Sequence, residues 1–123
     1  MDRISKLIDE IREYGINNNV PIMSVETINT INKIIDENNI KSILEIGTAI
    51  GYSAILMANA NGFCEITTIE RDEKRYKEAV KNVNRSGLDK RIELVYNDAM
   101  EVNLGDNKYD LIFIDAAKGQ YIK

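Results

Sequence analysis

The segment at residues 45–53, Glu-Ile-Gly-Thr-Ala-Ile-Gly-Tyr-Ser, could form an anion-binding turn. It lies where a short apolar run gives way to a helical pattern, and ligands of open parallel sheets bind beyond the carboxyl ends of the strands. Gly47 lets the backbone turn tightly, and the N–H groups at the start of the following helix can bind an anion. Ser53 adds a hydroxyl. Because glycines also occur between strands and helices for packing reasons, the turn alone is a weak indication.

The same segment departs from the pattern of dinucleotide sites. Those sites use G-x-G-x-x-G, whose middle glycine lets the backbone approach a pyrophosphate, and Ala49 stands at that position here. A cofactor without phosphates does not need such a close approach, and the methionine carboxylate of S-adenosylmethionine would suit the turn. The departure favours S-adenosylmethionine over NAD, and an NAD-dependent oxidoreductase is the weaker alternative.

Glu70 stands at the carboxyl end of the second predicted strand. A carboxylate at that point can accept hydrogen bonds from both ribose hydroxyls, which NAD and S-adenosylmethionine share. The alternative is that Glu70 caps the next helix, but Asp72 already fits that role. We therefore expect Glu70 to bind a ribose.

Asp98 and Ala99 follow the third predicted strand and could form an adenine pocket. The Asp98 carboxylate could accept a hydrogen bond from the adenine amino group, and Ala99 leaves space for the ring. A turn formed by Asn97 and Asp98 is the competing explanation. Asp115 ends the fourth predicted strand, so acidic residues recur at one edge of the predicted sheet. Solubility alone would not favour that recurrence.

Two amphipathic helices are expected before this candidate site. Apolar residues at helical spacing predict one over about residues 4–14, with Gly15 as its C-terminal stop. Ser24 can cap the second helix, which Asn38 and Asn39 would close. The segment 20–23, Val-Pro-Ile-Met, lies between the two helices.

After the second helix, short apolar strands alternate with helices, which predicts an α/β fold with a parallel sheet. Strands are expected at 42–46, 66–69, 92–96 and 109–114, with helices at 51–60 and from Asp72 to near Gly87. The fourth strand would lie at a sheet edge. Beyond Asp110 it lacks the proline or charge that protects natural edges, so we expect further strands to be missing.

The composition is that of a single soluble domain. The chain has 123 residues, of which 44% are hydrophobic and 29% charged, and this length gives room for one core. Polar residues interrupt every apolar run well short of a membrane span. Cys64 is the only cysteine and no apolar signal-type segment begins the chain, so we expect a reducing, cytoplasmic setting.

Charge is unevenly distributed along the chain, whose formal net charge is −4. Residues 71–91 contain eight bases and four acids. A solvated helix face is the favoured interpretation, and a surface that contacts phosphates is the alternative. Histidine is absent, so any proton transfer must fall to Lys, Asp, Glu or Tyr.

Four segments in this order resemble the metal-dependent O-methyltransferases, the group that contains catechol and caffeoyl-CoA methyltransferases. They are 20–23, 45–53, 68–72 (Thr-Ile-Glu-Arg-Asp) and 113–118 (Phe-Ile-Asp-Ala-Ala-Lys). Within that group the chain is most similar to the bacterial tRNA 5-hydroxyuridine methyltransferases. The resemblance covers nearly the whole chain and implies a Rossmann-like class I methyltransferase fold. Residues 1–123 would be a single S-adenosylmethionine-binding domain without its C-terminal strands.

The resemblance also implies which residues bind the cofactor. These are Met23, Gly47, Ser53, Glu70, Asp98, Ala99 and Asp115. Met23 would lie near the methionine end of the cofactor, Ser53 would bind its carboxylate, and Glu70 would hold the ribose. Asn97 stands where many relatives have glycine, which puts the local backbone of the adenine pocket in doubt.

Two residues near the end of the chain would carry the chemistry, by the same resemblance. Asp115 would contact the amino group of the cofactor and bind a divalent metal, with magnesium the expected ion. Lys118 would be the general base, and a solvent-exposed lysine without catalytic function is the alternative. The family's remaining metal ligands lie at the next strand, beyond this sequence, so we expect the 123-residue chain to be inactive alone.

The reaction implied is attack of a substrate oxygen on the sulfonium methyl group, with the metal binding two neighbouring substrate oxygens. We expect the complete protein to be a homodimer that methylates the 5-hydroxyl of a modified uridine in tRNA. A catechol-type small phenol is the alternative substrate. A non-catalytic fragment that binds S-adenosylmethionine is the alternative from another functional class.

Overall fold

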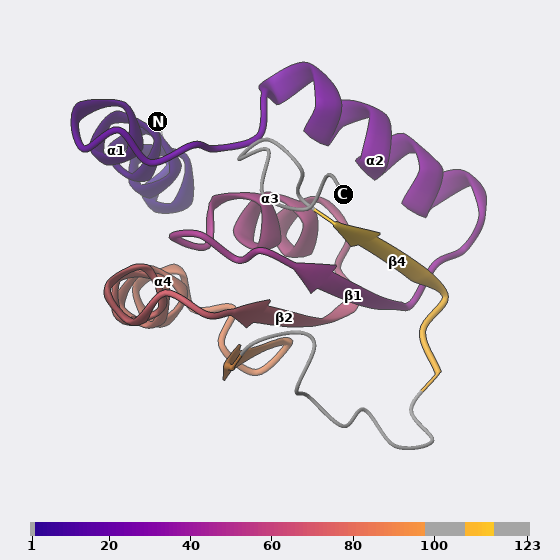
Figure 1. Ribbon diagram of the computed structural model, residues 1–123. Helices are drawn as coiled ribbons and strands as arrows, with labels where there is room; N and C mark the ends of the chain where they lie inside the picture. Colours follow the sequence, from indigo (N-terminus) through magenta and orange to yellow (C-terminus); the bar gives the residue numbers. More distant parts are fainter. Residues whose placement is uncertain (1, 98–107, 115–123) are drawn as a thin grey trace.

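The computed structural model describes residues 2–97 and 108–114, which form a parallel sheet flanked by helices (Figure 1). The strands pair in the order β3-β2-β1-β4, and every pairing is parallel. They are β1 (Ser42–Ile46), β2 (Glu65–Glu70), β3 (Ile92–Tyr96) and β4 (Leu111–Ile114). The helices are α1 (Arg3–Asn17), α2 (Val25–Glu37), α3 (Tyr52–Ala60) and α4 (Glu73–Ser86). The predicted α/β class with four parallel strands is confirmed.

The register of the sheet brings the ends of three strands together. Ile46 at the end of β1 pairs with Ile69 of β2 on one side and with Ile114 of β4 on the other. Since all strands run in the same direction, the segments that follow them emerge at one edge. This edge carries the loop between β1 and α3 and the end of β2 at Glu70.

Both sequence-predicted N-terminal helix caps are confirmed. Ser24 precedes α2, and its Oγ accepts a hydrogen bond from the Thr27 amide at 3.2 Å. Asp72 precedes α4, and its carboxylate accepts from the Arg75 amide at 3.0 Å. Both side chains satisfy an amide that the helix itself leaves without a partner. The first turn of α4 is thereby fixed directly after Glu70.

Gly15 does not end the first helix, contrary to the sequence-based expectation. Helix α1 continues to Asn17, and Gly15 lies buried inside it. A Cβ atom at Gly15 would lie 3.3 Å from Ile22 Cγ2 and 3.6 Å from Ile50 Cδ1. The glycine therefore allows close packing of α1 against the segment at Ile22 and the loop at Ile50. This non-local role looks the same in the sequence as a local helix stop.

Smaller boundary differences concern α3, β2 and β4. Helix α3 begins at Tyr52 with Gly51 as its N-terminal cap, β2 is one residue longer at each end than expected, and β4 begins at Leu111. Asp110 precedes β4, and its carboxylate accepts hydrogen bonds from the Lys41 and Ser42 amides at the start of β1. The Asp110 carboxylate therefore joins the starts of β1 and β4, and its charge lies outside the strand.

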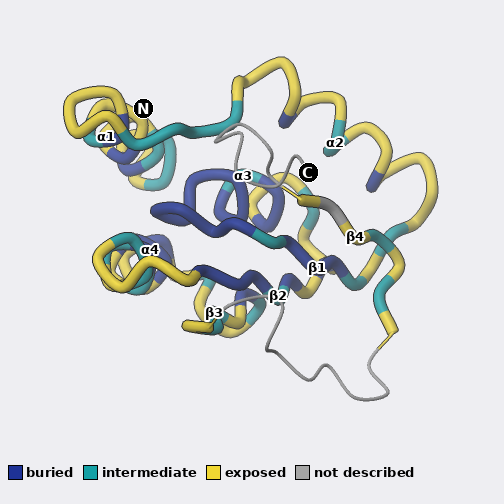
Figure 2. Tube along the Cα trace, in the orientation of Figure 1, coloured by how far each residue is buried: buried dark blue, intermediate teal, exposed yellow. Residues whose placement is uncertain are grey.

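Helix α3 and the two inner strands form the buried centre (Figure 2). Helices α3 and α4 both contact β2 and β3, and α1 and α2 pack on α3. Strand β4 forms one edge, where Ile112 and Ile114 are 58% and 50% exposed. Among the described residues, no helix has the length and apolar character needed to cross a membrane.

Replacing Gly51 should reveal the backbone strain at the start of α3. Gly51 has a φ of 92°, and an added Cβ would make only ordinary contacts of 3.6 Å with Ala79 and Val83. We expect Gly51→Ala to lower the free energy of unfolding by roughly 1–2 kcal/mol, because alanine is strained in this conformation. Gly62→Ala is the control, since no atom lies within 4 Å of its added Cβ. Equal urea midpoints for the two variants would contradict this account.

Candidate functional site

The loop at residues 47–51 folds back onto the end of β2. Gly47, Ala49 and Gly51 all have left-handed φ values, of 102°, 51° and 92°. The amides of Gly47 and Thr48 both donate to the Ile69 carbonyl, at 2.8 and 3.2 Å. Glycine tolerates this conformation readily, whereas alanine does so only when its surroundings hold it there. The predicted tight turn at Gly47 is thus present and is fastened to the neighbouring strand.

Glu70 joins this loop to the start of α4. Its Oε1 accepts from the Ala49 amide at 2.7 Å, and its Oε2 accepts from the Asp72 amide at 3.0 Å. The side chain is buried, with 5% of its surface exposed. A carboxylate oxygen has more than one acceptor position, so these bonds leave capacity for a ligand hydroxyl. Helix α4 itself is capped by Asp72, so the expected ribose role of Glu70 does not compete with that capping role.

A second buried carboxylate, Glu45, lies on β1 beneath the start of α3. The Ser53 hydroxyl donates to Glu45 Oε2, and the Thr68 hydroxyl donates to Glu45 Oε1 at 2.7 Å. Glu45 and Thr68 are fully buried, and Ser53 is 5% exposed. Ser53 has a single proton, which Glu45 accepts here, so its expected contact with a ligand carboxylate requires that hydroxyl to reorient.

Asn82 of α4 holds the loop from the helix side. Its Nδ2 donates to the Ile50 carbonyl at 2.9 Å, and the side chain is 2% exposed. The sequence-predicted site residues do not include Asn82, Glu45 or Thr68. Their common signal was present: each is a polar residue at a position where the strand or helix pattern calls for an apolar one. Buried polar groups of this kind are paired, as these are.

The sequence-predicted residues are only partly brought together by the described structure. Gly47, Ser53 and Glu70 share one edge of the sheet, linked through the loop and the buried carboxylates. Met23 is half-buried against the hydrophobic core. The remaining candidates, Asp98, Ala99, Asp115 and Lys118, lie outside the described residues. Within residues 2–97 and 108–114, no cluster of three metal-ligating side chains occurs.

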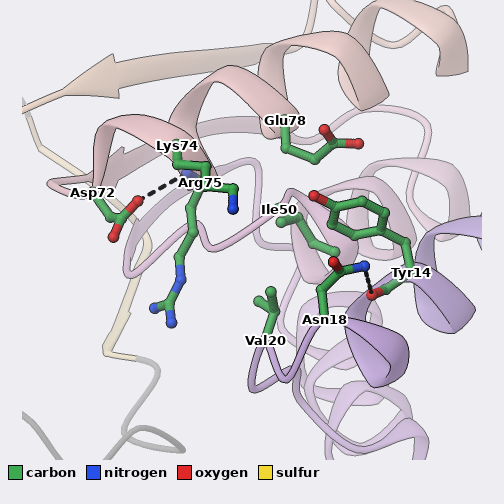
Figure 3. Close-up of a pocket in the computed structure, with 8 residues that line it drawn as sticks. All are labelled: Tyr14, Asn18, Val20, Ile50, Asp72, Lys74, Arg75 and Glu78. Atoms are coloured by element: carbon green, nitrogen blue, oxygen red, sulfur yellow. Dashed lines mark hydrogen bonds between the residues drawn. The ribbon is translucent and has the colours of Figure 1, made fainter.

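A cleft of about 220 Å³ lies between α1 and the first turns of α4 (Figure 3). Ile50 of the loop and Asp72 line it, but Glu45, Ser53 and Glu70 do not. Lys74, Arg75, Asp72 and Glu78 line it too, so the cleft carries both signs of charge. In Figure 3 the Arg75 side chain extends away from α4, and the Glu78 carboxylate lies on the same side of the cleft as the Tyr14 ring. We therefore place the candidate site at the loop and the two carboxylates.

Tyr52, the first residue of α3, is a poor candidate for a general base. Its side chain is buried, and burial raises the pKa of the phenol above its ordinary value. The phenol therefore stays protonated near neutral pH. Tyr52 is consequently disfavoured as the residue that takes a proton from a substrate.

Comparison with known proteins gave consistent matches. The O-methyltransferase family matches residues 2–123. A catechol O-methyltransferase of Niastella koreensis is 40% identical over 89 residues, which cover 66% of this chain and 39% of that protein. A Staphylococcus aureus crystal structure, described as a candidate caffeoyl-CoA O-methyltransferase, has a TM-score of 0.84 at 41% identity, covering 90% of this chain and 54% of that one.

A Bacillus cereus O-methyltransferase, solved in complex with S-adenosylhomocysteine (SAH), has a TM-score of 0.79 at 26% identity. The match covers 89% of this chain and 54% of the B. cereus chain. The present chain thus spans about half the length, or less, of the relatives it matches.

Asn82→Ala should destabilise the protein through the loop. The substitution leaves the Ile50 carbonyl without the donor that now satisfies it, in a buried setting. We expect a loss of roughly 1–3 kcal/mol in the free energy of unfolding, measured by urea denaturation. Asn84→Ala is the control on the same helix, because the Asn84 side chain is exposed. Alanine has the higher helix propensity, so the control should lose no stability, and a loss of the same size in both variants would contradict a specific role for Asn82.

Proposed function

The chain belongs to the O-methyltransferase family, and we propose that it forms the cofactor-binding part of an S-adenosylmethionine-dependent O-methyltransferase. The observation that carries this proposal is Glu70, buried at the end of β2 and bonded to the left-handed loop at Ala49. The similar B. cereus enzyme was solved with SAH, which supports the same cofactor here.

The residues at this edge fit the parts of S-adenosylmethionine. Glu70 offers carboxylate oxygens to the two ribose hydroxyls while it holds the loop in place. The left-handed glycine at position 47 keeps side-chain atoms out of the turn. Ser53 lies in the first turn of α3, where a hydroxyl and helix amides can face a carboxylate. We keep Met23, Asp98, Ala99 and Asp115 as proposed contacts of the cofactor.

The bound cofactor supplies a methyl group that a substrate oxygen takes from the sulfonium sulfur. The chain would prepare that oxygen with two residues that follow β4 in the sequence. We propose that Asp115 holds a divalent ion, magnesium by its preference for oxygen ligands, which lowers the pKa of a substrate hydroxyl. Lys118 would accept the proton. Without histidine in the chain, lysine and the carboxylates are the groups available for that step.

Two substrate classes fit a site that binds neighbouring oxygens, namely 5-hydroxyuridine in tRNA and small phenols of the catechol type. The tRNA class is favoured by the resemblance of segments 20–23 and 48–53 and by the exposed bases Lys74, Lys77, Lys81 and Arg85 on α4. Two of these bases are paired, Lys77 with Glu73 and Arg85 with Glu10, which weakens the second argument. The similarity to a catechol O-methyltransferase favours the phenol class.

The cofactor assignment predicts that the protein binds S-adenosylmethionine and SAH in preference to NAD. Isothermal titration calorimetry with the three ligands measures this directly. Glu70→Ala should weaken SAH binding by roughly 1–3 kcal/mol, because the ribose loses a charged acceptor. Glu65→Ala is the matched control, at the opposite end of β2 and exposed. Equal or tighter binding of NAD would overturn the assignment.

The substrate proposal predicts that a strain lacking the gene loses 5-methoxyuridine-type modification of its tRNA. Nucleoside analysis by mass spectrometry should show the modification restored by the wild-type gene and not by Asp115→Ala. If the modification is unchanged in the deletion strain, the tRNA class is wrong. Methylation of a catechol by the purified complete protein, abolished by a metal chelator, would then support the phenol class.

A further inference from the structure

We propose that Thr68 is a positioning residue for the amino-acid end of the cofactor, acting through Glu45 on Ser53. The inference rests on the proposed function, because it assumes that Ser53 faces that end of S-adenosylmethionine. Thr68 is fully buried in β2 and cannot itself touch a ligand at the surface of the site. What it contacts is the carboxylate on which the Ser53 hydroxyl depends.

Counting protons fixes the direction of this hydrogen-bond chain. The Thr68 hydroxyl donates its one proton to Glu45 Oε1 at 2.7 Å. The 2.6 Å contact between the Thr48 and Thr68 hydroxyls must therefore be donated by Thr48. Ser53 donates to the other carboxylate oxygen, Oε2. The chain runs from the loop through β2 to β1, and there it meets the donor from α3.

Burial makes this arrangement rigid. Thr48, Thr68 and Glu45 are 1%, 0% and 0% exposed, so bulk water cannot replace a lost partner freely. Hydrogen bonds to a buried carboxylate are strong, and paired donors on its two oxygens fix the plane of the group. Thr68 holds one oxygen and Ser53 holds the other. The position of the Ser53 hydroxyl is thus coupled through Glu45 to Thr68, which is on a different element.

Ser53 is the one of these four hydroxyl and carboxyl groups that lies in the first turn of α3. Ser53 keeps 5% exposure, whereas Glu45 behind it has none, so a ligand can reach Ser53 and not Glu45. Because its proton is donated to Glu45, the Ser53 oxygen offers the ligand an acceptor, which suits the ammonium of the amino-acid group. If Thr68 loses its hydroxyl, Glu45 loses its donor on Oε1, and the Ser53 hydroxyl that donates to the same carboxylate is held less firmly. The cost should fall on the amino-acid end of the ligand and leave the nucleoside end, held by Glu70, largely unaffected.

The test compares two ligands that differ at that end. SAH carries the amino-acid group, whereas 5′-methylthioadenosine has the same nucleoside without it. Calorimetry measures the affinity for each of the two ligands in the wild-type protein, in Thr68→Val and in Thr68→Ser. Thr67→Val is the matched control, because Thr67 is the neighbouring residue of β2 and its side chain points to the opposite face of the sheet. Circular dichroism and urea denaturation establish that each variant is folded.

We expect Thr68→Val to lower SAH affinity about ten-fold, as for the loss of one hydrogen bond to a charged group. Its affinity for 5′-methylthioadenosine should stay within about two-fold, the range of substitutions that remove no contact. Thr68→Ser keeps the hydroxyl and should restore SAH binding, and Thr67→Val should behave as wild type.

An equal loss of both ligands in Thr68→Val would overturn the inference, because a purely structural role weakens the whole site. Unchanged SAH affinity in that variant would overturn it too, as would failure of Thr68→Ser to restore binding. These results leave the proposed cofactor intact. A wild-type protein that binds neither ligand would instead overturn the proposed function itself, and the positioning role with it.

Discussion

The hydrogen bond from the Ala49 amide to Glu70 is the constraint on which this edge of the sheet depends. Ala49 is a buried alanine in a left-handed conformation, which costs roughly 1 kcal/mol or more and leaves its amide in need of an acceptor. Glu70 supplies that acceptor and, with its other oxygen, holds the Asp72 amide. One carboxylate therefore sets both the shape of the loop and the start of α4.

The two inner strands are divided into an apolar half and a polar half on the face that meets α3. Ile43 and Ile66 pair at the start of β1 and β2, whereas Glu45 and Thr68 occupy the same face near the strand ends. The apolar half packs with α3 as ordinary core, and the polar half replaces apolar contacts with hydrogen bonds. Burying a carboxylate costs free energy unless hydrogen-bond donors surround it, and here Ser53 and Thr68 supply them. The polar half lies near the strand ends, where a ligand of a parallel sheet would bind.

Features that depend on neighbouring residues in the sequence were predictable. The strand positions follow from short apolar runs, and the caps at Ser24 and Asp72 follow from side chains adjacent to a helix start. The positions of Gly47 and Glu70 at strand ends were also predictable, and their roles in binding stay a prediction. The roles of Gly15 and Asn82 were not predictable, because they depend on contacts in space: Gly15 packs against Ile22 and Ile50, and Asn82 bonds to the Ile50 carbonyl. Glu45 belongs to the predicted turn motif, but its pairing with the Ser53 and Thr68 hydroxyls is visible only in the structure.

The N-terminal helix belongs to the same constraint, although it lies far from the sheet in the sequence. Ile50 is 1% exposed, and its side chain packs next to Gly15 of α1, where an added Cβ would lie 3.6 Å from Ile50 Cδ1. Its carbonyl is held on the opposite side by Asn82 of α4. The loop is therefore clamped between two helices while Glu70 fixes it from the strand below. A loop of left-handed residues held from three directions is preorganised, so a ligand that binds beside it does not have to order the backbone first.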